Sequence, residues 1–328
     1  MTTLSIIVPV YNGAAFLPPF MASVQRLLDE GDVELVMVND GSTDGTAEML
    51  DAISSANPSI RALHVENGGQ GRAKNLGAAA ASGRYLWFVD VDDLLDVRVP
   101  TEFLVQLSEE GIDILLTGFE RYDAVSGCSL GVYRPQIASG RVASSHISRF
   151  DDLGHSAWNK VVSKKIFFLP GNQFVEGRIH EDLAVVPLWL TSSRHIFCDP
   201  VIRYRYGVRP ASSIHGNYSR HDDLMFALSH LMFYGAVEAR RLGPSIVKEL
   251  FFYSLPRFAS GLGKGCTWRN YWQCYSASRG FFGSIPRQCR RTMCAQLSVA
   301  QRIYVHATYC GGWMMPMVLA GAKRLLKR

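Results

Sequence analysis

The feature that most constrains the fold is an alternation of apolar runs and helical segments over the first ninety residues. Strand-like apolar runs lie at 5–10, 33–38, 60–65 and 85–89. Helix-like segments separate them at 14–28, 43–53 and 71–82. This alternation is typical of an α/β fold, with a mostly parallel sheet and helices on both faces.

Polar side chains follow three of the predicted strands at the point where each one ends. Asn12, Asp40 and Asp90 come directly after the first, second and fourth strands. In open α/β sheets, ligands bind at the edge formed by the carboxyl ends of the strands. The sequence therefore predicts a ligand site at this edge.

Composition excludes several classes of protein. Of 328 residues, 48% are hydrophobic and 19% are charged, which excludes intrinsic disorder. Seven cysteines without a CxxC pair favour neither a disulfide scaffold nor a zinc cage. No apolar run reaches the ~18–20 residues of a membrane-spanning helix. The odd cysteine count and the lack of a signal peptide predict a reducing, cytoplasmic location.

Charge divides the chain into two predicted regions, 1–220 and 221–328. The first carries a net charge of −6 and the second of +11. The second region is expected to be helical, with aromatic residues interleaved with arginines. It is either a subdomain with its own core or a surface that binds an anionic membrane. No nucleic-acid-binding module is recognisable in it, so a nucleic-acid partner is not expected.

The middle of the chain is less regular. Strands are predicted at 113–119 and 201–206, and helical segments at 155–168 and 180–190, separated by a glycine-containing loop over 169–178. Residues 127–149 are predicted to be loop or strand.

The most informative tetrapeptide is Asp90-Val91-Asp92-Asp93. Three carboxylates gathered at a strand end repel one another unless a cation lies among them. Their hard oxygen atoms favour Mg²⁺ or Mn²⁺, which keep open positions for substrate phosphates. The alternative is an acidic turn in which Asp93 caps the following helix.

A glycine-rich loop at 67–71 opens the third predicted helix. The helix carries Arg72 and Lys74, and a helix N-terminus with nearby cations suits phosphate oxygens, which makes Gly69 and Lys74 candidate phosphate contacts. The loop is neither a Walker loop nor a GxGxxG fingerprint. At the rim, Asp40 is either part of a turn or an acceptor for a nucleobase or ribose hydroxyl.

A second acidic cluster, Glu181-Asp182, stands ahead of an apolar helix. It is not part of an HExxH zinc motif, because no second histidine follows. The pair is either an acid-rich helix N-terminus or contains a general base.

Together these motifs resemble those of the family 2 glycosyltransferases, inverting enzymes with a GT-A fold and nucleotide-sugar donors. The resemblance spans residues 4–215 and is carried by SIIVPVYN (5–12), ELVMVNDGSTDGT (34–46), ENGGQGRAKNLGAAAASGRYLWFVDVDD (66–93), AWNKVV (157–162) and EGRIHEDL (176–183).

On the donor side, the resemblance assigns Val10, Tyr11 and Asp40 to the nucleoside pocket. Asp90 and Asp92 match the DxD motif of the metal site, with Asp92 on the divalent ion and Asp90 beside the ribose.

Two positions depart from the family pattern. Lys74 stands where the family often has arginine, which weakens the case for a bidentate contact. Gly207 stands where many members have an arginine, so the resemblance transfers the pyrophosphate contact to Arg209.

On the acceptor side, the resemblance makes Asp182 the catalytic base, paired with Glu181. Trp158, Asn159 and Lys160 match a segment that lies beside the acceptor.

The sequence therefore predicts a metal-dependent inverting glycosyltransferase that uses Mn²⁺ or Mg²⁺ and a nucleotide-sugar donor, in particular a UDP-sugar. The expected acceptor is a cell-surface glycan or a lipid-linked intermediate, and the enzyme would be peripheral on the inner face of the cell membrane if its basic region binds lipid.

Two alternatives remain open. A nucleotidyltransferase would need a GxGxR-type loop after the first strand, and residues 11–15 do not form one. A sugar-nucleotide-binding scaffold without activity is disfavoured by the intact Asp90, Asp92 and Asp182.

Overall fold

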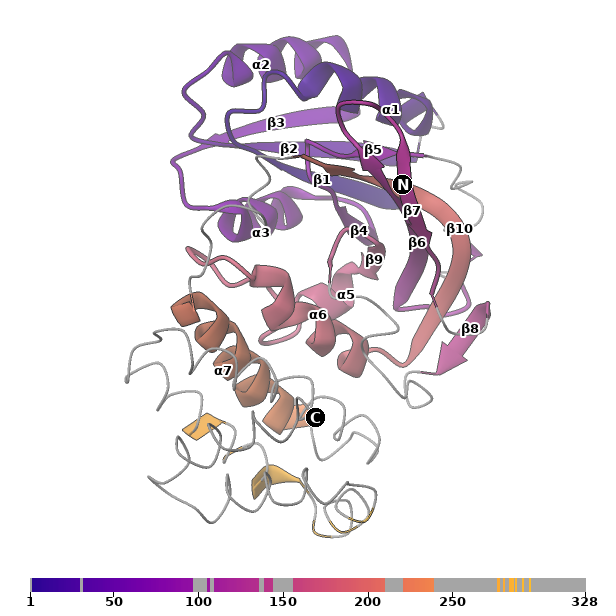
Figure 1. Ribbon diagram of the computed structural model, residues 1–328, viewed down its shortest axis with the longest axis vertical. Coiled ribbons are helices and arrows are strands. Elements are labelled where there is room, and N and C mark those ends of the chain that lie inside the picture. The colour runs from indigo at the N-terminus through magenta and orange to yellow at the C-terminus, as the bar shows by residue number, and fades with distance from the viewer. Residues whose placement is uncertain are drawn as a thin grey trace.

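The computed structural model describes residues 2–29, 32–96, 105–106, 109–135, 139–143, 156–209 and 221–238, with isolated positions between 276 and 295. The elements, in chain order, are β1 (Leu4–Val10), α1 (Leu17–Asp29), β2 (Val33–Asp40), α2 (Thr46–Ala56), β3 (Ile60–Val65), α3 (Gln70–Ala80), β4 (Tyr85–Phe88), β5 (Leu94–Leu95), β6 (Ile114–Asp123), β7 (Ser129–Tyr133), β8 (Gly140–Ala143), β9 (Lys160–Ser163), α5 (Lys164–Phe167), α6 (Glu181–Ser192), β10 (His195–Val208) and α7 (His221–Glu238) (Figure 1).

The described strands form one sheet in the order β3-β2-β1-β4-β9-β6-β10-β5, with β7 on β6 and β8 on β10. Strands β3, β2, β1 and β4 run parallel to one another. Strand β9 is antiparallel to both of its neighbours, β4 and β6. The predicted α/β class is confirmed: a parallel N-terminal half joined to a mixed second half.

The register aligns the strand ends that carry polar residues. Val10 pairs with Asn39, and Asp40 pairs with Val65, so β1, β2 and β3 end at one edge. Ile7 pairs with Phe88, which brings the segment after β4 to the same edge. The polar residues after β1, β2 and β4 therefore share the rim that the sequence predicts.

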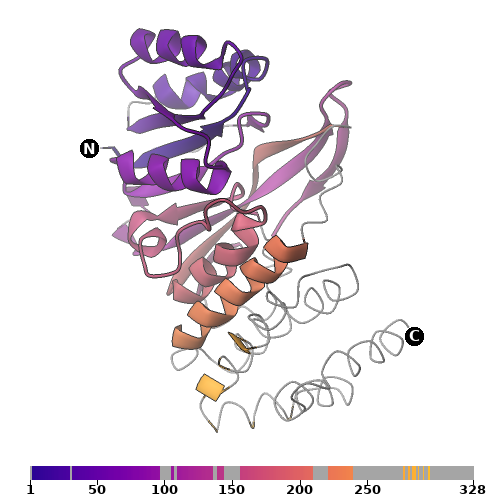
Figure 2. The same cartoon turned by 90° about the vertical axis from the view of Figure 1, so that its left-hand side faces the viewer.

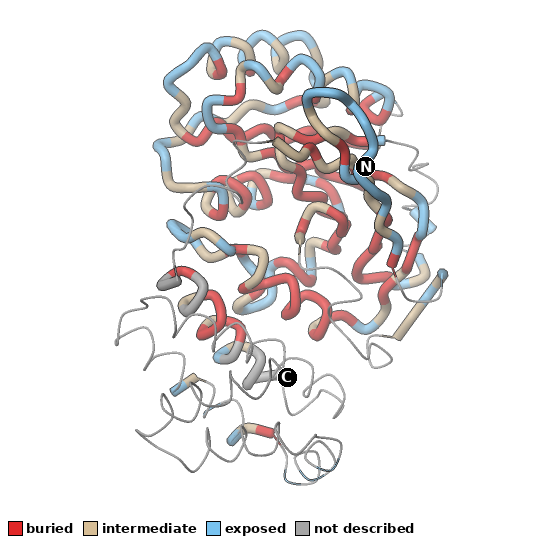
Figure 3. The backbone as a smooth tube through the Cα atoms, viewed as in Figure 1, coloured by how far each residue is buried: buried red, intermediate tan, exposed pale blue. Residues whose placement is uncertain are grey.

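Helices cover both faces of the sheet (Figure 2). Side chains of α1 and α2 pack with Leu35 and Met37 on one face, whereas α3 packs on Val36 and Val38 on the other. Because both faces are covered, β2 is buried along its whole length (Figure 3). Burial on both faces explains why its sequence is a continuous apolar run instead of an alternating one.

The predicted helix over 155–168 is wrong. Lys160–Ser163 forms β9, a buried strand between β4 and β6, and only Lys164–Phe167 is helical. The β-branched Val161 and Val162 suit a strand, and pairing with two neighbours satisfies backbone groups that a helix would have satisfied locally. Residue 155 lies outside the described part of the chain.

The predicted helical character after residue 221 is confirmed for α7, which packs against α6 (Figure 2). Most of the predicted basic, aromatic region over 221–328 lies outside the described residues. Among the helices that are described, none combines the length and apolar character needed to cross a membrane.

Candidate active site

The loops after β1 and β2 are tied to each other at the rim. The Asn12 amide donates to Ser42 Oγ at 2.9 Å, and the Thr43 amide donates to Asn12 Oδ1 at 2.8 Å. Asn12 has a φ of 48°, a left-handed conformation that asparagine tolerates better than most residues. These bonds hold the predicted nucleoside contacts in place, with Val10 buried and Tyr11 55% exposed.

Asp40 fixes the glycine-rich loop in front of α3. Its two carboxylate oxygens accept hydrogen bonds from the Gly68 amide at 2.8 Å and the Gly69 amide at 2.9 Å. Gly69 has a φ of 86°, which a residue with a Cβ rarely adopts. Asp40 therefore shapes the α3 N-terminus, and its contact with a nucleoside stays a prediction. Each oxygen keeps a second lone pair for such a contact.

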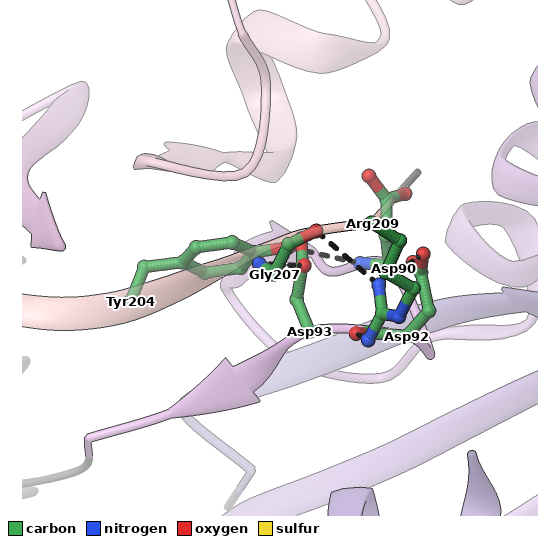
Figure 4. Close-up of polar contacts among 6 residues, drawn as sticks. All are labelled: Asp90, Asp92, Asp93, Tyr204, Gly207 and Arg209. Carbon is green, nitrogen blue, oxygen red and sulfur yellow. Dashed lines mark hydrogen bonds and ion pairs between the residues drawn. The ribbon is translucent and has the colours of Figure 1, made fainter. Parts of the chain in front are cut away.

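Asp93 is buried and bonded to β10 (Figure 4). Its oxygens accept hydrogen bonds from the Tyr204 hydroxyl at 2.6 Å and the Gly207 amide at 2.7 Å. The alternative in which Asp93 caps a following helix is therefore wrong. Burial and the charges of Asp90 and Asp92 raise the pKa of Asp93 well above its usual range, against the effect of these two hydrogen bonds.

Asp92 is paired with Arg209 at the same rim (Figure 4). Arg209 Nη1 lies 2.7 Å from Asp92 Oδ2, and its other terminal nitrogen contacts the Asp92 carbonyl oxygen. Burial and neighbouring Asp90 raise the pKa of Asp92, while Arg209 opposes the shift. The guanidinium also lies 4.9 Å from the centre of the Phe16 ring. The predicted pyrophosphate contact therefore stands next to the predicted metal ligand.

Arg209 lies over Gly207. A Cβ at Gly207 would lie 3.0 Å from Arg209 Nη2, so a side chain there would displace the end of the arginine. The family's assignment of the pyrophosphate contact to Arg209 stays a prediction.

Lys74 joins the two acidic clusters. Its residue is 3% exposed, and its Nζ lies 3.1 Å from Glu181 Oε1 and 3.6 Å from Asp90 Oδ1. Burial disfavours the charged ammonium, but the surrounding carboxylates of Asp90, Glu181 and Asp182 outweigh it and raise the pKa of this lysine. Lys74 and Glu181 are 107 positions apart in the sequence. The lysine is therefore a cation shared by the predicted donor and acceptor sides.

The predicted catalytic pair stands at the first turn of α6. His180, immediately before it, has a φ of 65° and a ψ of 32°, a left-handed conformation. Asp182 is partly exposed and accepts a hydrogen bond from the Ala157 amide at 3.3 Å. Glu181 is 2% exposed and held by Lys74; burial and Asp182 raise the pKa of Glu181 despite that cation. Asp182 is therefore the carboxylate of the pair that a substrate hydroxyl can reach.

The structure places the predicted acceptor residues at different depths. Trp158 is partly exposed and stacks on Tyr204, with ring centres 4.5 Å apart. Asn159 and Lys160 are buried, and Lys160 Nζ donates to Asn159 Oδ1 at 2.8 Å. Burial lowers the pKa of Lys160 to about 7, although Asp182 opposes the shift. Asn159 Nδ2 is buried with no hydrogen-bond partner in the described structure.

Tyr204 is a site residue that the sequence did not indicate. Its hydroxyl donates to Asp93 and accepts from the Asp90 amide at 3.3 Å, while its ring supports Trp158. It therefore connects the Asp90–Asp93 turn to the acceptor side. Its position in an alternating run of arginine and tyrosine gives no sign of this role.

The donor set fits a divalent ion that is shared with a substrate. Within the described residues, no group of three or more His, Cys, Asp or Glu side chains could hold a metal alone. Mg²⁺ commonly takes one or two carboxylates and completes its shell with phosphates and water. Asp90 and Asp92 supply such oxygens, and both burial and the neighbouring Asp90 raise the pKa of Asp92, so a cation between the two carboxylates would favour the charged form.

Comparison with known proteins gives the same assignment for the N-terminal part. Residues 5–153 match the model of glycosyl transferase family 2. Glycosyltransferase GlyG of Streptococcus pneumoniae serotype 4 is 33% identical over 127 residues, which are 38% of this chain and 41% of the relative. The uncharacterized glycosyltransferase EpsJ of Bacillus subtilis is 34% identical over 139 residues, or 42% and 39% of the two chains. The matched segments thus cover about two fifths of each relative.

Among solved structures, Staphylococcus aureus TarS 1–349 in complex with UDP-GlcNAc aligns with 99% of this chain and 92% of its own. The TM-score is 0.72 and the sequence identity is 18%, a likeness that concerns the fold. The family match assigns residues 5–153 to a glycosyl transferase family 2 domain, and the likeness to TarS shows a GT-A-type α/β fold.

Proposed function

We propose that this protein is an inverting glycosyltransferase that moves a sugar from a nucleoside diphosphate donor to a hydroxyl of a glycan or a lipid-linked acceptor. The observation that carries the proposal is the position of Lys74. Its Nζ lies within 3.6 Å of both Asp90 on the donor side and Glu181 on the acceptor side. Two acidic clusters beside one buried cation suit a reaction with a metal-bound leaving group and a separate base.

In this proposal Asp182 removes the proton of the acceptor hydroxyl as its oxygen attacks the anomeric carbon. The new carbon–oxygen bond forms as the bond to the diphosphate breaks, and the electron pair leaves with the diphosphate. A single displacement inverts the anomeric centre. A divalent ion held by Asp92 and Asp90 would supply charge neutralisation at the leaving group. Arg209, which lies beside Asp92, would face the same negative charge.

The proposed donor is a UDP-sugar. The fold of TarS, which binds UDP-GlcNAc, supports this choice. Tyr11 and Asp40 stand at the rim where a nucleoside would bind, and the Asp40 carboxylate is an acceptor for a base N–H or a ribose hydroxyl.

A panel of sugar nucleotides tests the activity and the donor together. The purified full chain is incubated with UDP-GlcNAc, UDP-glucose, UDP-galactose or GDP-mannose, with and without Mn²⁺, and the released nucleoside diphosphate is measured. Release from a UDP-sugar that depends on Mn²⁺ supports the proposal. Tight binding of UDP without any release would instead support a scaffold without activity. The anomeric configuration of the product, followed by NMR, tests inversion.

The same assay tests the base. Asp182→Asn should lose ~10²–10⁴-fold in turnover, the usual effect of removing a general base, and should still bind UDP with Mn²⁺ normally. Asp51→Asn, a change at a side chain that is 69% exposed, is the control. Near-normal turnover in Asp182→Asn would transfer the role to Glu181.

A membrane surface is the proposed partner of region 221–328, on the strength of its net charge of +11. The basic residues at the end of the chain, which lie outside the described part, would supply up to ~4 kcal/mol on anionic lipid. Full-length protein should sediment with anionic vesicles at low salt and dissociate at high salt. Equal recovery in the supernatant with anionic and neutral vesicles would exclude this partner.

A further inference from the structure

Residues 169–180, the α6 entry loop, connect α5 to the catalytic pair. The loop contains Gly171 and Gly177, with φ values of 85° and 66°, and ends at the left-handed His180. Such a loop has few backbone bonds of its own. Its conformation, and with it the position of Asp182, must come from the elements on either side of it.

On its inner side the loop is bound to α3. The Asn75 side chain accepts a hydrogen bond from the Phe174 amide at 3.0 Å and donates to the Phe174 carbonyl at 2.9 Å. A Cβ at Gly71 would lie 2.5 Å from the Val175 carbonyl oxygen, so the two backbones are in direct contact. These contacts connect the loop to the helix that carries Lys74.

On its outer side the loop is bound to α7 (Figure 1). The Asp223 carboxylate accepts from Arg178 Nη1 at 2.8 Å and from the Ile179 amide at 3.5 Å. At the other end of the loop, His230 Nε2 donates to the Gly171 carbonyl at 2.8 Å. The Asp223 side chain is 5% exposed and the Arg178 side chain 42%, so the carboxylate of the ion pair is buried whereas the arginine reaches the surface.

The α7 residues that contact the loop lie on one face of the helix. Asp223, Phe226, His230 and Tyr234 follow a spacing of three or four residues, which places them on one side of the helix. The Arg178 guanidinium lies 5.0 Å from the centre of the Phe226 ring, and a Cβ at Gly171 would collide with the Tyr234 ring. The face therefore fits both ends of the α6 entry loop.

We infer that α7 sets the position of the catalytic pair, with Asp223 as a positioning residue that acts through Arg178 and the Ile179 amide. The inference rests on the proposed function for its effect on turnover. Ile179 is three residues before Asp182, and the left-handed His180 lies between them, so a change in the Ile179 peptide rotates the first turn of α6. The beginning of region 221–328 is thus part of the catalytic unit.

The test compares Asp223→Asn and Asp223→Glu with wild type in the full chain. Asp223→Asn should lower turnover of the sugar nucleotide accepted in the panel about tenfold, while the Kd for UDP with Mn²⁺ stays within about twofold, because the donor rim is untouched. Asp223→Glu restores the carboxylate and should recover part of the loss. Unchanged turnover in Asp223→Asn, or a parallel loss of UDP affinity, would overturn the inference.

A control is a second ion pair with a buried aspartate, Asp199 and Arg203, whose side chains are 10% and 6% exposed. It lies in the bulged part of β10. Asp199→Asn should reduce the melting temperature about as much as Asp223→Asn and leave turnover unchanged. An equal loss of turnover in both variants would mean that Asp223 acts only through global stability.

Hydrogen exchange tests the contact without any substrate. In Asp223→Asn, peptides covering 176–182 should exchange faster than in wild type, whereas peptides covering β1 should not change. If Asp223→Asn fails to fold, His230→Ala removes the anchor at the other end of the loop and should give a smaller effect in the same direction. Unchanged exchange over 176–182 would contradict the inference even if no sugar nucleotide is turned over.

Discussion

The two halves of the site are held by different kinds of contact. In the donor half, residues 4–96, Asp40 accepts hydrogen bonds from the backbone amides of Gly68 and Gly69, and the Asp90–Asp93 turn is bonded to the end of β10. In the acceptor half, residues 156–208, the buried Glu181 is held by the side chain of Lys74 on α3. The donor half is therefore held at the strand ends of the sheet, whereas the acceptor half depends on what packs around α6.

The electrostatics of the halves differ in the same way. The acceptor half buries Lys160 with a pKa lowered to about 7 and leaves Asn159 Nδ2 without a partner in the described structure. A buried amide nitrogen without a partner is costly unless a ligand or water completes its bonding. The acceptor half therefore holds one such nitrogen beside a buried lysine, whereas the Asp40 carboxylate in the donor half is already bonded to two amides.

The substitution with the largest expected effect is in the donor half. Asp92→Asn removes the proposed metal ligand and leaves Arg209 without its carboxylate partner. Turnover should fall by at least about 100-fold, because charge neutralisation by a bound metal is worth several kcal/mol in the transition state. The affinity for UDP, measured by calorimetry with and without Mn²⁺, should also no longer depend on the metal. A variant that keeps the wild-type metal dependence would remove Asp92 from the site.

The second prediction concerns Lys74, which contacts carboxylates of both halves. Lys74→Met leaves buried carboxylates without their cation and should cost ~3–5 kcal/mol of stability, as for other broken buried pairs. UDP affinity and turnover should fall together, unlike in Asp182→Asn, and Lys74→Arg should restore part of both. The control is Lys165→Met, at an exposed lysine paired with Asp113. A loss of turnover with normal UDP affinity would show that Lys74 serves the acceptor half alone.

The sequence predicted the strands of the donor half well because their signals are local. An apolar run followed by a polar residue identifies a strand and the point where it ends, and β1, β2 and β4 follow that rule. The Asp90–Asp93 turn was recognised from its carboxylates alone. The bonding of Asp93 was missed, since its partners Tyr204 and Gly207 are on β10, 111 and 114 positions away.

The acceptor half was harder to predict because little of it is local. Strand β9 has four residues and begins with a lysine, so no periodicity separates it from a helix. Lys74 and the α7 residues that bind the α6 entry loop join segments far apart in the sequence. Arg178 and Asp223, for example, are 45 positions apart. A sequence pattern reports what a segment needs to bury and not which distant side chain it meets.

The third prediction concerns how stability depends on pH in the acceptor half. The folded state holds Lys160 with a pKa near 7, whereas the unfolded chain has the ordinary value of 10.5. Between these values the unfolded state binds more protons, so the free energy of unfolding should gain a contribution that rises with pH, by at most about 1.4 kcal/mol per pH unit. In Lys160→Met this rise should disappear. Urea denaturation at pH 7 and pH 9.5 measures it, with Lys165→Met as control; equal slopes in all three proteins would contradict the burial of a neutral lysine.

The smallest effects compare the two left-handed residues, Asn12 in the donor half and His180 in the acceptor half. Asn12→Gly keeps the backbone conformation but loses the bond from the Thr43 amide, and should cost ~0.5–1.5 kcal/mol. His180→Gly removes the cost of the left-handed conformation, ~1–2 kcal/mol, which stabilises the folded state. It also raises the entropy of the unfolded chain, which destabilises the folded state, so the net change in stability should be small. His180→Val, which is β-branched, should be destabilised and should lose turnover while binding UDP normally. Thermal unfolding measures the stability of the three variants, and UDP calorimetry together with the turnover assay measures their function. If His180→Val kept full turnover, the backbone turn before Asp182 would have no part in placing the base, and the acceptor half would be as tolerant as an ordinary loop.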